Sequence, residues 1–138
     1  MNAMQYPLVS ILTPTYNYAH YLSGCIESVF KQTYPNIEMI VIDDGSTDNT
    51  QDIVKNYQKY YPHLVYLYQE KQSRGKWNLG IVDAQNKGLA LAKGEYVGFL
   101  ASDERFVPEK LEIQVKFFQE YERKNLPLGL VHSSYYCE

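Results

Sequence analysis

The sequence predicts an α/β fold in which a mostly parallel sheet is covered by helices on both faces. Short apolar runs rich in β-branched residues alternate with segments whose apolar residues recur every three or four positions. This alternation is typical of repeated βα units, whose strands pair in parallel. At 138 residues, with 45% hydrophobic and 21% charged residues, the chain suits a single globular domain of ordinary composition.

The first part of the chain predicts two strand–helix units. Leu8 to Thr13 is a short apolar run, and we expect it to stop at Pro14, which has no N–H for a central ladder. From Tyr21 the apolar residues recur at helical spacing, and we expect this helix to end at "QTYPN", because Pro35 restricts the residue before it. The run from Ile37 to Ile42 is apolar at most positions, which predicts a strand buried on both faces. The expected apolar helix faces are Leu22, Ile26, Val29 and Phe30 in the first helix and Ile53, Val54, Tyr57 and Tyr61 in the second.

Helix boundary signals are clear at several positions. Thr47 or Asp48 can cap the second helix. A third helix is predicted from Leu79 to Ala92, with Gly94 as its C-cap. Pro108 is expected as the first residue of a last helix, whose apolar face would carry Leu111, Val115, Phe118 and Tyr121.

The later apolar runs predict three more strands. They extend from Leu64 to Tyr68, from Tyr96 to Leu100 and from Leu128 to Ser133. We expect His132, on the last of these, to be a packed histidine rather than a catalytic base. Trp77, in the polar stretch before the third helix, suits either a lid or acceptor contact or an anchor of the loop to the core.

Composition excludes several classes of protein. The net charge of −3 argues against a general nucleic-acid binder. No apolar run approaches the roughly 20 residues of a membrane span, so no transmembrane segment is expected. Residues 1–6 read as a leader that is partly cloning residue and not a signal peptide. Cys25 and Cys137 are expected to be reduced thiols of a cytoplasmic protein, and no spacing suits zinc.

Three polar clusters directly follow predicted strands. They are "PTYN" after the first strand, "DDGSTD" after the second and "ASDER" after the fourth. In parallel sheets, ligands bind beyond the carboxyl ends of the strands, so we expect the three clusters to meet at one edge.

The residue types in these clusters suit a nucleotide diphosphate with a divalent cation. Asp44 could accept a hydrogen bond from a base N–H or a ribose hydroxyl, and Tyr16 offers a ring on which a base can stack. Asp103 is a hard oxygen ligand for Mg²⁺ or Mn²⁺. Plainer structural roles are open for each: Tyr16 as a packing residue, Asp103 as a cap, and Asp43 and Asp48 as turn and cap residues.

The clusters also resemble a known family. "PLVSILTPTYN", "QTYPNIEMIVIDDGSTDNT", "NKGLALAKGEYVGFLASDE" and "PEKLEIQ" are similar to the N-terminal half of family 2 glycosyltransferases, which have the Rossmann-like GT-A fold. The resemblance implies a nucleotide-sugar donor, commonly UDP-linked, and transfer of the sugar with inversion. It implies that Pro14 and Tyr16 line the uracil pocket and that Asp44 binds the base. It also implies that Asp103 binds the metal, and that Ser102 beside it contacts the nucleotide.

The sequence departs from the family pattern in two ways. Ala101 stands where the family usually has the first aspartate of its DxD motif, which weakens the expected metal site. Residues 7–138 match only the donor-binding half, so the acceptor half is expected to be lacking, with the catalytic base beyond Glu138. Glu104 lies near the site, but the resemblance gives it no role as a base.

Two interpretations of the function remain open. In the first, the chain is the donor-binding part of a glycosyltransferase of bacterial-type polysaccharide synthesis, with a glycan or lipid-linked acceptor. It would be cytoplasmic, with peripheral contact to the inner face of the membrane left open, and apolar surface left by a missing half could self-associate. In the second, it is a non-catalytic nucleotide-binding or interaction module. A nucleotidyltransferase is less favoured, because "TPTYN" is not a Gly-rich basic loop.

Overall fold

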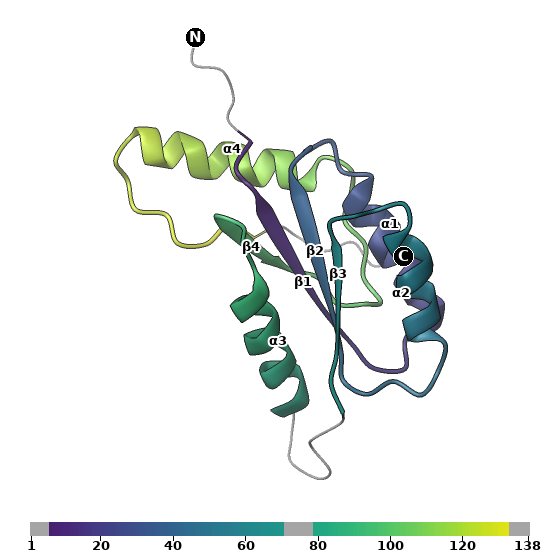
Figure 1. Ribbon diagram of the computed structural model, residues 1–138. Coiled ribbons are helices and arrows are strands. Elements are labelled where there is room, and N and C mark those ends of the chain that lie inside the picture. Colours follow the sequence, from purple (N-terminus) through teal and green to yellow (C-terminus); the bar gives the residue numbers. More distant parts are fainter. Residues whose placement is uncertain (1–5, 71–78, 133–138) are drawn as a thin grey trace.

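The computed structural model describes residues 6–70 and 79–132, and within them four parallel strands form one sheet (Figure 1). The strand order is β3-β2-β1-β4, and each neighbouring pair is parallel. The predicted mostly parallel sheet is therefore confirmed. The strands are β1 (Val9–Thr15), β2 (Ile37–Asp43), β3 (Leu64–Tyr68) and β4 (Tyr96–Phe99).

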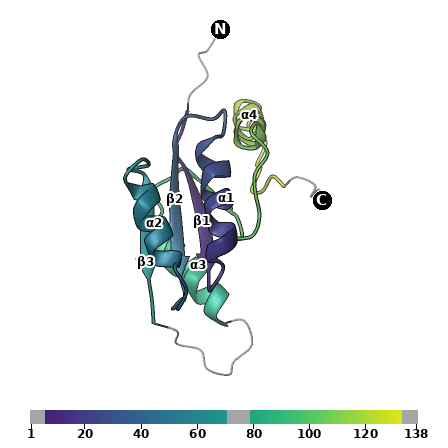
Figure 2. The same ribbon diagram turned by 90° about the vertical axis from the view of Figure 1, so that its right-hand side faces the viewer.

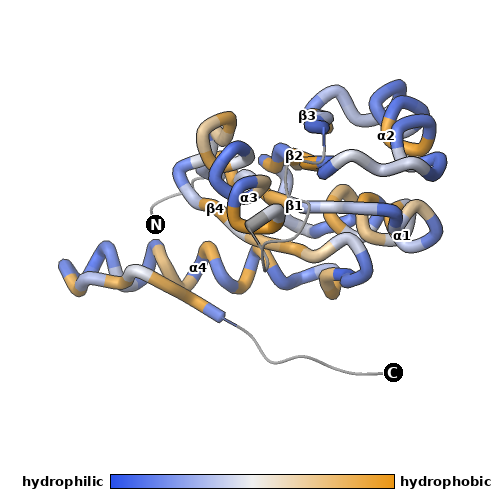
Figure 3. Tube along the Cα trace, turned by 90° about the horizontal axis from the view of Figure 1, so that it is seen from below, coloured by the Kyte–Doolittle hydropathy of each residue, from blue (hydrophilic) through white to orange (hydrophobic). Residues whose placement is uncertain are grey.

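Helices cover both faces of this sheet, as expected. In Figure 1, α1 and α2 lie to one side of the strands and α3 to the other. In the rotated view of Figure 2, α1 and α2 lie in front. Hydrophobic and hydrophilic stretches alternate along α4 in Figure 3, in agreement with its predicted amphipathic pattern. The helices are α1 (Ala19–Phe30), α2 (Thr50–Gln58), α3 (Leu79–Leu91) and α4 (Lys110–Arg123).

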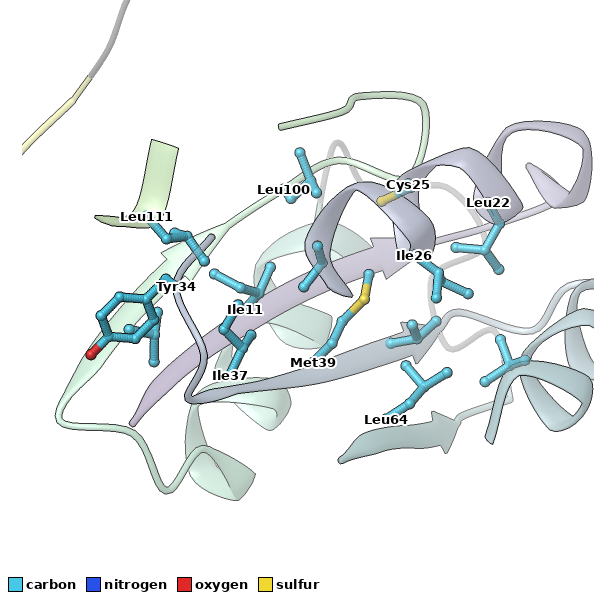
Figure 4. Packing of buried hydrophobic residues seen from close by; sticks show 14 of the residues in the cluster. Ile11, Leu22, Cys25, Ile26, Tyr34, Ile37, Met39, Leu64, Leu100 and Leu111 are labelled. Atoms are coloured by element: carbon cyan, nitrogen blue, oxygen red, sulfur yellow. The ribbon is translucent and has the colours of Figure 1, made fainter. Parts of the chain in front are cut away.

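The strand alternation divides the core between the two faces. Ile11 and Met39 belong to the larger cluster, which packs beneath α1, α2 and α4 (Figure 4). Leu12 and Ile40 belong to a smaller cluster that includes Ala84 of α3. All seven residues of β2 are buried, which confirms the prediction of a strand buried on both faces. The sheet is thus held from both sides, and its carboxyl edge has a fixed geometry.

Strand β1 runs past Pro14, where we expected it to end. Pro14 pairs with Ile42 of β2, while pairing with β4 stops at Leu12 and Phe99. The carbonyl of Leu12 faces the β4 side, where it accepts from Leu100 N–H, and alternation places Pro14 on that same side. The missing N–H of Pro14 therefore falls where β1 has no ladder partner, and the proline costs the sheet nothing.

The regions around α3 and α4 differ from expectation in two details. Gly94 does not take the left-handed conformation of a helix C-cap: Gly45 has the only positive φ among the described glycines. The N–H of Gly94 donates to the Ser10 hydroxyl at 2.8 Å, and a Cβ added at Gly94 would lie 2.6 Å from Ser10 N. Glycine is therefore needed at this position for the close approach to β1. Pro108 lies in a turn two residues before α4 rather than within its first turn.

The predicted strand from Leu128 to Ser133 is wrong in its described part. Residues 128–132 form no strand, and the carbonyl of Val131 accepts from the Gln114 side chain of α4 instead of from a neighbouring strand. An apolar run forms a strand only where it can pair with the edge of a sheet. This run follows the loop after α4, and its described part pairs with no strand. His132 is exposed there, so the expectation of a packed histidine is also wrong.

The helices in residues 6–70 and 79–132 do not include one with the length and apolar character of a membrane span.

Candidate functional site

Two of the three polar clusters meet at the carboxyl edge of the sheet. Strands β1 and β2 are neighbours, and the backbone N–H of Asp44 donates to the carbonyl of Thr15 at 2.9 Å. This bond continues the parallel ladder one residue beyond β2. It places Asp44 beside Pro14 and Tyr16, as the sequence predicted, with Asp44 and Pro14 half-buried and Tyr16 38% exposed.

Asn17 joins the loops that carry these residues. Its backbone N–H donates to the Ser46 hydroxyl at 2.9 Å, and its side-chain oxygen accepts from Thr47 N–H at 2.8 Å. Asn17 has a φ of 54°, in the left-handed region that asparagine tolerates better than most residues. A further bond runs from Ala19 N–H to Asp48 at 3.0 Å. The two loops therefore form one hydrogen-bonded unit.

Asp43 stabilises the turn from inside the protein. It is 1% exposed, and its two oxygens accept from Ser46 N–H at 2.8 Å and from the Tyr66 hydroxyl at 2.6 Å. Burial and then the bond to this carboxylate raise the pKa of Tyr66 well above its usual range. Gly45 follows with a φ of 82°. The adjacent carboxylates of Asp43 and Asp44 thus have different partners, and the interpretation of Asp43 as a turn residue fits the structure.

Asp48 ties the turn to the start of α2. Its carboxylate accepts from the Thr50 hydroxyl at 2.6 Å and from Thr50 N–H at 3.1 Å, besides the bond from Ala19. Burial opposes ionisation, but these hydrogen bonds outweigh it, so the pKa of Asp48 lies below its ordinary value of 3.8. The predicted capping role is thus filled by Asp48, while Asn49 at the N-cap position makes no side-chain cap bond.

The lowered pKa of Asp48 makes a prediction for acid stability. A group with a depressed folded-state pKa contributes stability above its unfolded pKa and loses it as the pH falls through the folded value. We expect thermal melts of the wild-type protein to lose stability below about pH 4 more steeply than melts of Asp48→Asn, because the amide does not titrate. Equal pH dependence of the two proteins between pH 6 and 3 would contradict this role.

The third cluster lies on the other side of β1. Ser102 is 6% exposed and Asp103 is exposed, in a turn closed by Glu104 N–H donating to Ala101 O at 3.0 Å. The buried Cys25 thiol of α1 donates to the same carbonyl at 3.5 Å. Burial raises the pKa of this thiol to about 12, so it stays neutral. Cys137 lies outside the described residues.

The structure brings the first two clusters into direct contact but anchors the third on α1. Strand β4 pairs with β1, so Ser102 and Asp103 share the carboxyl edge with Asp44. Among residues 6–70 and 79–132, no three His, Cys, Asp or Glu side chains gather as a metal cluster. Asp103 is exposed, and the side chain of Ala101 supplies no oxygen beside it.

Sequence reasoning missed two residues beside Asp44. Gln69 is buried directly after β3, and its amide donates to the Asp44 carboxylate at 2.8 Å. The ammonium of Lys87 in α3 donates to the oxygen of the same amide, Gln69 Oε1, at 2.7 Å. The position of Gln69 after a strand could have identified it, whereas no sequence pattern points to Lys87. Trp77 lies outside the described residues.

The chain is similar in sequence to known glycosyltransferases. The sequence profile of "Glycosyl transferase family 2" matches residues 10–129. The chain is 42% identical over 114 residues to the "Putative teichuronic acid biosynthesis glycosyltransferase TuaG" of Bacillus subtilis, covering 83% of this chain and 43% of that protein. The chain thus spans less than half the length of this relative.

Solved structures of similar fold include nucleotide complexes. S. aureus TarS 1–349 in complex with UDP superposes with a TM-score of 0.73 at 32% identity, covering 83% of this chain and 33% of that one. The mannosyltransferase PcManGT of Pyrobaculum calidifontis in complex with GDP-Man and Mn²⁺ gives a TM-score of 0.69 at 28% identity, covering 83% and 33% of the two chains. TarS 1–349 is also solved with UDP-GlcNAc. With the fold and the sequence profile in agreement, this chain belongs to glycosyl transferase family 2.

Proposed function

We propose that the chain binds a UDP-sugar at the carboxyl edge of its sheet. The observation that carries this is the joined pair of loops that holds Asp44 beside Pro14 and Tyr16. A carboxylate oxygen there can accept the N3–H of uracil, and the Tyr16 ring can stack on the base. The UDP and UDP-GlcNAc complexes of TarS, a protein of the same fold, support the choice of nucleotide.

A divalent cation fits this site only together with the nucleotide. Asp103 offers one exposed carboxylate, and Ala101 has no oxygen in its side chain. Mg²⁺ and Mn²⁺ are held in many proteins by one or two carboxylates together with substrate phosphates. We propose Asp103 as the protein ligand and Ser102 as a contact to the nucleotide, and the Mn²⁺ complex of PcManGT supports a cation in this fold. When bound, the cation would neutralise the charge of the diphosphate.

The wider role that we propose is sugar transfer with inversion during polysaccharide synthesis. The teichuronic acid name of the Bacillus subtilis relative supports this role, with a glycan or lipid-linked acceptor. The relative is more than twice as long as the matched region, and we propose that its acceptor site and general base lie outside that region. We therefore propose that the 138 residues alone bind donor without efficient transfer, at a cytoplasmic site that can include the inner membrane face.

Nucleotide selectivity tests the proposal. We expect UDP to bind more tightly than ADP, GDP or CDP in calorimetric titrations of the 138-residue chain. Cytosine presents an acceptor at N3, which the Asp44 carboxylate would repel, whereas uracil presents a donor. Equal affinity for all four diphosphates would show that the base is not recognised. No binding of any of them would favour an interaction module that has no nucleotide site.

The proposed cation makes a separate prediction. UDP should bind a few-fold more tightly in millimolar Mn²⁺ than in EDTA, because one carboxylate supplies only part of the coordination shell. Ala101→Asp should increase this dependence by adding a second anionic carboxylate, and Ala101→Asn, whose amide oxygen is neutral, is the matched control for the charge. Equal UDP affinity with and without Mn²⁺ would remove Asp103 from its proposed role.

A further inference from the structure

Gln69 fixes one oxygen of the Asp44 carboxylate. Its backbone N–H donates to Asp43 O at 2.9 Å, which holds the residue in line with the sheet. Its side-chain Nε2 donates to Asp44 Oδ1 at 2.8 Å, and Gln69 is only 8% exposed. Within the described residues, Oδ1 is the only oxygen of the Asp44 carboxylate that receives a hydrogen bond, so Oδ2 is the oxygen that this part of the chain leaves available.

Lys87 determines which way the Gln69 amide points. Its ammonium donates to Gln69 Oε1 at 2.7 Å and pairs with Asp83 Oδ2 at 2.8 Å, one helical turn earlier in α3. An ammonium group only donates and a carboxylate only accepts. A flipped amide would set its NH₂ against Lys87 and its oxygen against Asp44, so only the observed orientation satisfies both neighbours.

We propose that Gln69, oriented by Lys87, makes Asp44 a one-oxygen acceptor and so sets a preference for uracil over guanine. Uracil presents a single ring N–H between two carbonyls, which one free carboxylate oxygen can satisfy. Guanine presents two adjacent donors, N1–H and the 2-amino group, which pair best with both oxygens of a carboxylate. With Oδ1 held by Gln69, the second donor of guanine loses its partner.

In this arrangement Gln69 and Lys87 are positioning residues that act through Asp44. The inference rests on the proposed uridine site and adds the source of its selectivity. A lysine that instead touched the diphosphate would strengthen UDP and GDP binding equally, since the two ligands share that group. The ratio of UDP to GDP affinity therefore separates base selection from a general electrostatic or structural contribution.

The test is calorimetric titration of UDP and GDP into the wild-type chain and into Gln69→Leu and Lys87→Met. We expect the ratio of UDP to GDP affinity to fall about tenfold in Gln69→Leu, as for loss of one hydrogen bond to a charged group. Lys87→Met should lower the ratio in the same direction by about threefold, since the amide remains but is free to turn. Adding Lys87→Met to Gln69→Leu should change the ratio no further, because Lys87 acts through the amide.

Lys93→Met is the matched control, since it removes the same charge from an exposed lysine just after α3. It should leave the ratio unchanged. A ratio that is unaltered in Gln69→Leu, or a Lys87 effect that persists in the double variant, would overturn the inference. If Gln69→Leu does not fold by circular dichroism, Lys87→Met decides alone, because that side chain is 38% exposed.

The same titrations distinguish failure of the proposed uridine site from failure of the selectivity inference. If the wild-type chain binds neither nucleotide, or Asp44→Asn leaves UDP affinity unchanged, the uridine site is wrong and the selectivity inference is overturned with it. If the wild type prefers UDP, Asp44→Asn weakens it and Gln69→Leu leaves the ratio intact, only the role of Gln69 is overturned.

Discussion

Asp44→Asn is expected to weaken UDP binding by at least about tenfold, because hydrogen bonds to charged groups contribute roughly 1.5–3 kcal/mol. The side chain is half-buried at the sheet edge, and its backbone bond to Thr15 does not depend on the carboxylate. An amide can still accept from Gln69 through its oxygen, but its NH₂ would then face the N3–H of uracil. The fold should therefore persist while the base loses its acceptor, which calorimetry would measure directly.

Asp52→Asn provides the matched control for this loss. Asp52 is exposed in the first turn of α2, and the substitution makes the same chemical change away from the β1–β2 edge. It should bind UDP as the wild type does. Equal UDP affinity of Asp44→Asn and wild type would remove Asp44 from the proposed base pocket.

Asp43→Ala is expected to destabilise the protein itself, by about 3 kcal/mol in the free energy of unfolding. The change leaves the hydroxyl of Tyr66 and the N–H of Ser46, both on half-buried residues, without the buried carboxylate that is their acceptor. Each such loss costs roughly 1–3 kcal/mol, since the unpaired group has given up water without replacement. Urea denaturation followed by circular dichroism would measure the difference.

Tyr66→Phe separates the two parts of this cost. It removes the donor to Asp43 and leaves the bond from Ser46, so we expect a loss of about 1 kcal/mol. The double variant should lose less stability than the sum of the losses in the two single variants, because the two residues share one hydrogen bond. A change below about 0.5 kcal/mol for Asp43→Ala, the range of ordinary surface substitutions, would contradict the structural role.

The sequence predicts the carboxyl edge well because its signals are local. A buried run such as Ile37 to Ile42 ends in charged residues, and parallel pairing then brings successive strand ends together. The pair Asp43 and Asp44 could be located in this way. That Asp43 turns inward to Tyr66 could not be predicted, since it depends on β3 lying beside β2.

The features that escaped prediction depend on distant neighbours. Pro14 remains in β1 because β4 has already stopped pairing on that side, which β1 alone does not reveal. Leu128 to Ser133 has a strand-like composition but no strand along its described part. Lys87 reaches Gln69 across 18 positions of sequence, and only the packing of α3 on the sheet brings them together.

A crystal structure of the chain with UDP and Mn²⁺ is the most direct test of the proposed donor site. We expect the uracil N3–H to lie within hydrogen-bond distance of Asp44 Oδ2, with the ring against Tyr16 and the Gln69 amide still on Oδ1. The diphosphate should extend past β1 toward Asp103, with the cation between them. A UDP molecule bound away from the carboxyl edge, or a uracil with no contact to Asp44, would contradict the proposed donor site.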